Sequence, residues 1–147
     1  MTAVRFYLVR HGRAEPAGPS GDSARRLTPE GRAGFTAHAR AVAARMGVRH
    51  IATSPFARAR ETSELLAAAT GAPVADEEAL ASGASSAREL LALGRGLGAG
   101  AALVGHNPEI AEAVALAAGR SLEVKPGAVA AVDAEGETFR LAWLEAP

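Results

Sequence analysis

The sequence has 147 residues, 48% of them apolar, and this length predicts one domain, spanning residues 1–147, with its own hydrophobic core. Sixteen basic residues balance sixteen acidic ones, which argues against a nucleic-acid-binding protein that acts through its bulk charge. The chain has no cysteine, so it forms no disulfide and no zinc–thiolate site. It also has no apolar stretch long enough to span a bilayer and no signal-peptide pattern, and we therefore expect a cytoplasmic protein without a membrane span.

Apolar runs of strand length alternate along the chain with longer segments of helical periodicity. Capping residues such as Thr28 and Ser86 mark helix starts, and glycines such as Gly47 and Gly119 mark helix ends. In chain order, the pattern predicts strand 4–9, loop 15–26, helix 28–47, strand 49–53, helix 54–71, strand 73–75, helix 86–97, strand 101–104, helix 107–119, strand 128–132 and strand 138–144. This alternation predicts an α/β fold: a three-layer sandwich with a mostly parallel central sheet and helices on both faces.

Polar residues cluster directly after three of the predicted strands. The clusters are Arg10-His11-Gly12, Ser54-Pro55-Phe56-Ala57-Arg58 and Gly105-His106-Asn107-Pro108. Ligands of open α/β sheets bind outside the carboxyl ends of the strands, and two of these clusters also begin a helix, whose free N–H groups attract anions. We therefore expect two histidines and two arginines to converge on one edge of the sheet.

These residue types suit the transfer of a phosphoryl group. The transferred group spreads negative charge over its oxygens, and guanidinium groups bind such oxygens through paired, charge-assisted hydrogen bonds. A neutral imidazole can attack phosphorus near physiological pH, since its unperturbed pKa lies close by. One histidine after a strand is usually structural, so the prediction rests on the complete set in this order.

The same residues form the motifs of a known family. Arg10-His11-Gly12 follows the first strand, Ser54-Pro55 precedes Arg58-Ala59-Arg60-Glu61-Thr62, and Gly105-His106 precedes a late helix. With this set the chain resembles the histidine phosphatase (phosphoglycerate mutase-like) superfamily over essentially its whole length. The resemblance implies the fold of that superfamily, which is the layered α/β arrangement already expected from the alternation of elements.

Within that superfamily the chain is most similar to the short bacterial phosphohistidine phosphatases of the SixA type. It has no room for the large insertions of mutases and acid phosphatases. Residues 54–59 and 22–31 match that branch closely, and the second segment carries a further arginine of the phosphate site, Arg25. Alternatively, Arg25 is a solvated charge on a loop and does not bind phosphate.

The resemblance implies a metal-independent phosphatase that needs no cofactor. His11 attacks phosphorus and becomes phosphohistidine, which water then hydrolyses. The groups that hold the phosphoryl oxygens are Arg10, Arg58 and His106. Further candidates for phosphate binding are Gly12, Arg25 and Asn107.

A departure from the family pattern bears on the substrate. Members that cleave alcohol phosphates carry an acid after the second helix that protonates the leaving oxygen, and here a serine, Ser82, stands at that place. Asp76, Glu77 and Glu78 lie just upstream and are either substitutes for that acid or a solvated acidic turn. Imidazole is a better leaving group than an alkoxide and needs less help from an acid. The pattern therefore favours phosphohistidine on a protein of the histidine-phosphotransfer type as the substrate. The alternatives are a small phosphorylated metabolite, such as a sugar or nucleotide ester, and a catalytically silent phosphate-binding module.

Overall fold

The central sheet has six strands in the computed structural model, which describes residues 3–147 and leaves residues 1 and 2 of the predicted domain outside the description. The strands, in chain order, are β1 (Val4–Arg10), β2 (His50–Thr53), β3 (Val74–Asp76), β4 (Ala101–Gly105), β5 (Val129–Glu135) and β6 (Thr138–Glu145). Their order across the sheet is β3-β2-β4-β1-β5-β6. The first four in this order are parallel, whereas β5 is antiparallel to β1 and β6 to β5, so the prediction of a mostly parallel sheet is confirmed.

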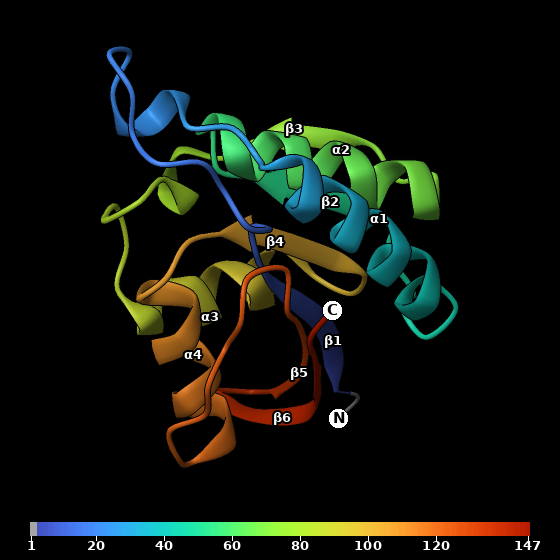
Figure 1. The fold of residues 1–147 in the computed structure, drawn as a ribbon. Coiled ribbons are helices and arrows are strands. Elements are labelled where there is room, and N and C mark those ends of the chain that lie inside the picture. Colours follow the sequence, from blue (N-terminus) through green and yellow to red (C-terminus); the bar gives the residue numbers. More distant parts are fainter. Residues whose placement is uncertain (1–2) are drawn as a thin grey trace.

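Helices cover both faces of the sheet (Figure 1). α1 (Pro29–Ala43) and α2 (Ala57–Thr70) lie on one face, and α3 (Ala87–Leu97) and α4 (Glu109–Ala118) lie on the other. The short 3-10 helices η1 (Asp22–Ala24) and η2 (Glu78–Leu80) lie in the connections. Within residues 3–147, no helix combines the length and the apolar character needed to cross a membrane. The layered α/β architecture that the alternation predicts is confirmed.

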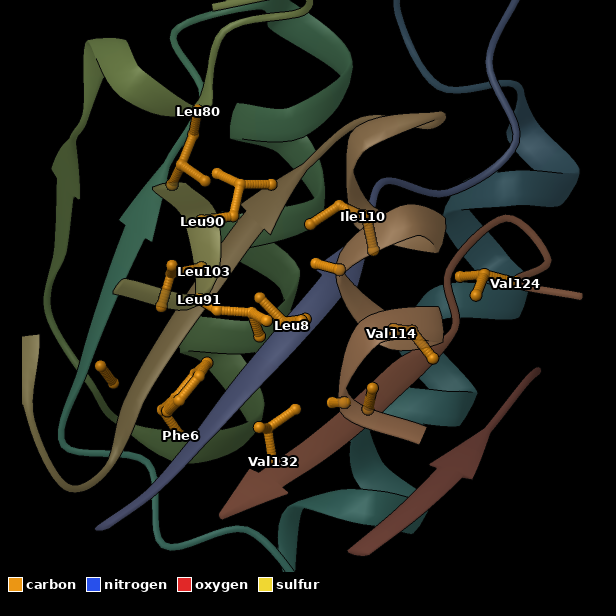
Figure 2. Packing of buried hydrophobic residues seen from close by; sticks show 14 of the residues in the cluster. Phe6, Leu8, Leu80, Leu90, Leu91, Leu103, Ile110, Val114, Val124 and Val132 are labelled. Carbon is orange, nitrogen blue, oxygen red and sulfur yellow. The ribbon is translucent and has the colours of Figure 1, made fainter. Parts of the chain in front are cut away.

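Strand β1 supplies side chains to both halves of the hydrophobic core, because successive residues of a strand point to opposite faces of the sheet. Phe6 and Leu8 pack among the residues of α3 and α4, as Figure 2 shows, while Tyr7 and Val9 pack among those of α1 and α2. Gly94 lets α3 approach β1 closely, since a Cβ at this position would collide with the Phe6 ring. Strand β1 is thereby fixed from both faces, and so is the start of the loop that follows it.

Two helix boundaries differ from the prediction. Helix α1 ends at Ala43 and not at Gly47, because the chain turns after Ala43 and the Gly47 N–H donates to the tyrosine hydroxyl of β1 at 3.0 Å. Helix α2 begins at Ala57 and not at Ser54, because the Ser54 N–H extends the sheet by donating to a carbonyl of β4 at 2.9 Å. Both predicted boundaries are wrong because a hydrogen bond to a distant part of the chain outweighs the local pattern.

The ends of β1, β2 and β4 lie side by side, since β4 pairs with both of the other strands. Arg10 at the end of β1 lies opposite Gly105 of β4, and Thr53 at the end of β2 lies opposite Val104. Each predicted polar cluster starts at or directly after one of these strand ends. The sheet therefore brings all three clusters to one edge, as expected from the sequence.

Candidate active site

The His11 imidazole is held in one tautomer by the backbone next to it. Its Nδ1 lies 2.6 Å from the carbonyl oxygen of Gly12, which can only accept a hydrogen bond, so Nδ1 carries the proton. The lone pair is then on Nε2, and the Nε–H of Arg58 donates to it at 3.2 Å. The backbone N–H of His11 donates to the Gly105 carbonyl at 3.0 Å, which continues the pairing of β1 with β4 past the strand end. The nitrogen with nucleophilic character thus faces the arginine of α2.

Burial keeps the His11 imidazole neutral at physiological pH. Burial of the ring, opposed by the hydrogen bond to the Gly12 carbonyl and reinforced by the positive charges of Arg58, Arg10 and Arg25, lowers its pKa to about 4. A neutral ring retains the lone pair that a nucleophile needs.

Arg58 uses all three of its guanidinium nitrogens within the cluster and is only 4% exposed. Besides His11, its partners both belong to Asp22: Nη1 donates to the backbone carbonyl at 2.7 Å and Nη2 to the carboxylate at 3.1 Å. The same carboxylate accepts from Nη1 of Arg25 at 3.2 Å. Hydrogen bonds from Arg25 and then from Arg58 lower the pKa of Asp22. A carboxylate therefore holds the two arginines together.

Asp22 is the residue of this cluster that the sequence reasoning missed. It lies on η1, three residues before Arg25, in the loop segment that matches the SixA branch. The available signal was this spacing, because residues three apart on a helical turn lie on the same side. Arg25 itself is tied to the loop, since its Nε also donates to the Glu15 carbonyl at 2.6 Å.

His106 lies beside His11, with 5.2 Å between the ring centroids, and is 2% exposed. Its Nε2 lies 2.7 Å from Oγ of Ser54, and its ring forms a T-shaped pair with the Phe56 ring at 5.0 Å between centroids. Its Nδ1 is buried and has no hydrogen-bond partner within residues 3–147. Burial, and after it the electrostatic effect of the neighbouring His11 and Arg58, lowers the pKa of His106 to about 3, so this ring is neutral too.

Arg10 and Asn107 meet at one backbone carbonyl. Nη1 of Arg10 donates to the Val124 carbonyl at 2.9 Å, and Nδ2 of Asn107 donates to the same oxygen at 3.1 Å. Oδ1 of Asn107 accepts the N–H of Ala111 in the first turn of α4 at 3.1 Å. Nε of Arg10 is buried without a partner in the described part of the chain. Arg10 thus has a donor left for an anion, while both polar ends of Asn107 are engaged by the protein.

The backbone N–H of Gly12 is already hydrogen-bonded to helix α2. This N–H donates to Oγ1 of Thr62 at 3.0 Å, and the Thr62 hydroxyl donates to the Arg58 carbonyl at 2.8 Å. The turn after β1 and the start of α2 are therefore linked by two hydrogen bonds through one threonine. Phosphate binding by Gly12, Arg25 and Asn107 stays a prediction.

The acidic residues considered as proton donors lie outside these contacts. Asp76 pairs with Arg60, Glu77 accepts the N–H of Ala79 at 3.4 Å, and Ser82 is exposed. Among the side chains of residues 3–147, Asp22 is the only carboxylate that hydrogen-bonds to any of the four core residues His11, Arg10, Arg58 and His106. The same residues contain no group of three or more His, Cys, Asp or Glu side chains with the arrangement of a metal site.

The sequence profile of the histidine phosphatase superfamily, branch 1, matches residues 6–83, which is more than half of the chain. The chain belongs to this superfamily. The match includes Arg10, His11, Arg25 and Arg58. No curated protein matches the chain in sequence.

Solved structures with the same architecture include several phosphatases. An Agrobacterium tumefaciens protein assigned as the phosphohistidine phosphatase SixA is 25% identical, with a TM-score of 0.84 over 100% of both chains. The protein histidine phosphatase SixA complexed with tungstate has the same TM-score of 0.84, at 22% identity over 97% of both chains. A mycobacterial glucosyl-3-phosphoglycerate phosphatase has a TM-score of 0.69, at 19% identity over 96% of this chain and 98% of the other. This histidine phosphatase is therefore a hydrolase with a SixA-like fold.

Proposed function

We propose that this histidine phosphatase, as a single domain spanning residues 1–147, hydrolyses protein phosphohistidine without a metal through a phosphorylated His11. One observation carries the proposal: the Nε2 lone pair of His11, whose other ring nitrogen is held by the Gly12 carbonyl, faces the guanidinium of Arg58. A nucleophile and a fixed positive charge at the same point are the two requirements of phosphoryl transfer.

The reaction takes place in two displacements at phosphorus. In the first, Nε2 of His11 forms an N–P bond while the P–N bond of the substrate breaks. The electron pair leaves with the substrate imidazole, which departs as a neutral ring because its other nitrogen carries a proton. The positive charge that develops on the His11 ring is stabilised by its Nδ1–H on the Gly12 carbonyl. In the second, water forms a P–O bond while the N–P bond to His11 breaks and Nε2 regains its lone pair. The two protons of the water molecule leave with the phosphate or pass to the solvent.

The arginines, together with a hydrogen-bond donor of the second histidine, stabilise the negative charge of the transferred group. Arg58 already contacts Nε2 of His11, and Arg10 retains a buried Nε–H without a partner in residues 3–147. Fixed donors of this kind stabilise the equatorial oxygens in a site that excludes water, where such hydrogen bonds are strongest. Because the two arginines supply positive charge, the reaction requires no bound cation.

Two observations favour phosphohistidine over an alcohol phosphate as substrate. First, an alkoxide leaving group needs a proton donor, and the position of that acid is occupied by Ser82. Asp76 pairs with Arg60 and Glu77 accepts the N–H of Ala79, so neither contacts the candidate active site. Second, the TM-scores are 0.84 for the two SixA structures and 0.69 for the glucosyl-3-phosphoglycerate phosphatase. Asp22 does not replace the acid, because its arginine partners lower its pKa and keep it ionised.

A hydrolysis panel tests this substrate class. Phosphohistidine on a histidine-phosphotransfer protein, a phosphoserine peptide and sugar phosphates are compared under identical conditions, with His11→Ala as the blank for contaminating phosphatases. General acid assistance contributes about 10²–10⁴-fold, so we expect kcat/KM for phosphohistidine to exceed that for the esters by at least about 10²-fold. Glu77→Gln and Glu78→Gln leave the phosphohistidine rate unchanged. A preference for sugar or nucleotide esters that collapses in one of these variants would instead support the small-metabolite alternative.

A further inference from the structure

Ser54 contacts the His106 ring from the end of β2 and is itself completely buried. Its Oγ lies 2.7 Å from Nε2 of His106 and accepts the backbone N–H of Phe56 at 3.2 Å. No other partner of this hydroxyl exists within residues 3–147. The position of its one proton therefore depends on which His106 nitrogen is protonated.

Two arrangements of protons are possible, and they differ in the number of buried groups left unpaired. If His106 carries its proton on Nε2, it donates to Ser54, and both the Ser54 O–H and the lone pair on Nδ1 of His106 have no partner in the described chain. If His106 carries its proton on Nδ1, the Ser54 O–H donates to Nε2, and only the Nδ1–H is unpaired. Each unpaired buried polar group is destabilising, because it has lost its hydrogen bonds to water, so the second arrangement is the more stable.

We propose that Ser54 is a positioning residue that fixes His106 as the Nδ1–H tautomer, so that a neutral ring offers a hydrogen-bond donor to a phosphoryl oxygen. The use of this donor rests on the proposed function, whereas the tautomer itself does not. In the free protein the Nδ1–H is the one group of the Ser54–His106 pair without a hydrogen-bond partner within residues 3–147. An oxygen of the bound phosphoryl group accepts this hydrogen bond.

The tautomer matters because burial leaves His106 uncharged. A histidinium could donate from either nitrogen, but a neutral ring donates from one and presents a lone pair at the other. A lone pair directed at a phosphoryl oxygen would repel it. The Ser54 hydroxyl therefore decides whether His106 attracts the transferred group or repels it, although we expect Ser54 itself to remain out of contact with the substrate.

The neighbouring groups hold this pair in place. The Phe56 N–H fixes the Ser54 oxygen, and the Phe56 ring forms a T-shaped pair with the His106 ring at 5.0 Å between centroids. The Ser54 backbone is anchored as well, since its N–H donates to the Val104 carbonyl at 2.9 Å. The hydroxyl has little freedom to turn to a different acceptor.

The direct test is the protonation state of the His106 ring nitrogens in the complete protein at pH 7. Histidine labelled with ¹⁵N distinguishes a protonated ring nitrogen from one with a lone pair, and the His106→Gln spectrum assigns the signals. We expect Nδ1 of His106 to be protonated and Nε2 to have the shift of a hydrogen-bond acceptor. A wild-type spectrum with the proton on Nε2 overturns the proposal, without any need for a variant.

Variants test whether Ser54 is the cause. In Ser54→Ala the Nδ1–H population should fall, and kcat should fall about 10- to 100-fold with little change in KM. Ser54→Thr keeps the hydroxyl and should restore both the tautomer and the rate. Ser63→Ala is the matched control, because Ser63 is also completely buried on α2 but its hydroxyl has no partner in the described residues.

The outcomes separate this inference from the proposed function. If Ser54→Ala folds with wild-type tautomer and kcat, Ser54 does not position His106. If Ser54→Ala does not fold, the wild-type spectrum and Ser54→Thr still decide between the two tautomers. If His106 is the Nδ1–H tautomer but no phosphorylated substrate is hydrolysed, the assignment to Ser54 stands and the proposed function fails.

Discussion

Nε of Arg58 donates a hydrogen bond to Nε2 of His11 over 3.2 Å, so the arginine contacts the very atom that is to attack phosphorus. This bond occupies the lone pair in the free protein. It must be released when phosphorus approaches Nε2, and the guanidinium is then already beside the oxygens of the incoming group. Arg58 is 4% exposed and its other nitrogens are held by Asp22, which limits how far it can move.

Replacing Arg58 with lysine should impair turnover although the charge is conserved. The ammonium group of lysine cannot reproduce the planar set of guanidinium donors with which Arg58 contacts His11 and Asp22 at the same time. The loss of one fixed donor to a developing charge costs about 10²–10³ in kcat, and we expect a fall of this size in steady-state kinetics with an aryl phosphate.

Arg60→Lys serves as the control for that variant. Arg60 lies on the same helix, but it is partly exposed and pairs with Asp76. Its replacement should leave kcat within about twofold, as is usual for exposed ion pairs. Equal kinetics of Arg58→Lys and the wild type would show that the guanidinium geometry does not matter.

Asp22→Asn should strengthen the binding of inorganic phosphate. The Asp22 carboxylate partly neutralises both Arg58 and Arg25, and a phosphate dianion must compete with it for them. The Asp22 side chain is half exposed, so the gain should be modest, up to about fivefold in the inhibition constant. Asp133→Asn, which breaks the pair with Arg5, is the matched control. Weaker phosphate binding in Asp22→Asn would mean that Asp22 mainly aligns the two arginines.

The stability of the protein should decrease as the pH falls below about 6.5. In the folded state burial lowers the pKa of His11 to about 4 and that of His106 to about 3, whereas unfolded histidine titrates near 6.5. Between pH 6.5 and 5 the unfolded chain therefore binds more protons than the folded one, and the free energy of unfolding falls. His38, whose pKa burial also lowers, acts in the same direction.

Urea unfolding at pH 7.0, 6.0 and 5.0 measures this effect. His11→Gln cannot titrate at that position and should lose less stability over the same range. An unfolding free energy that is constant from pH 7 to pH 5 in the wild type would contradict neutral, buried histidines.

Exhaustive treatment with EDTA should leave the activity unchanged. Arg10 and Arg58, with the donor of His106, provide the stabilisation that a cation gives in metal-dependent phosphatases. The measurement is the initial rate before and after chelation, with a metal-dependent phosphatase treated in parallel. Loss of activity that added Mg²⁺ or Zn²⁺ restores would refute a metal-independent reaction.

The sequence predicted the part of the site that depends on the order of strands. A run of apolar residues, a polar cluster directly after it and the next helix start are local features, and the rule for ligand positions in parallel sheets then places the clusters together. His11, Arg58 and His106 are found where this reasoning put them, with Arg58 on His11 and the two histidine rings side by side.

The sequence could not predict the contacts that loops make. Asp22 lies in a segment rich in Gly, Pro and Ser, whose path depends on tertiary contacts and not on periodicity. Glu61 directs that path, since its carboxylate accepts the N–H of Leu27 at 2.9 Å and pairs with Arg32 at 3.0 Å. A glutamate on a helix, three residues after Arg58, gives no sign in the sequence that it anchors a loop.

The covalent intermediate on His11 is tested most directly by trapping it. The protein is mixed with ³²P-labelled phosphohistidine substrate, quenched rapidly and digested, and the labelled peptide is identified. We expect label on His11 that is labile in acid and stable in alkali, and we expect none in His11→Ala, which should also lose turnover. Label on another residue, or full turnover by His11→Ala, would contradict His11 as the nucleophile.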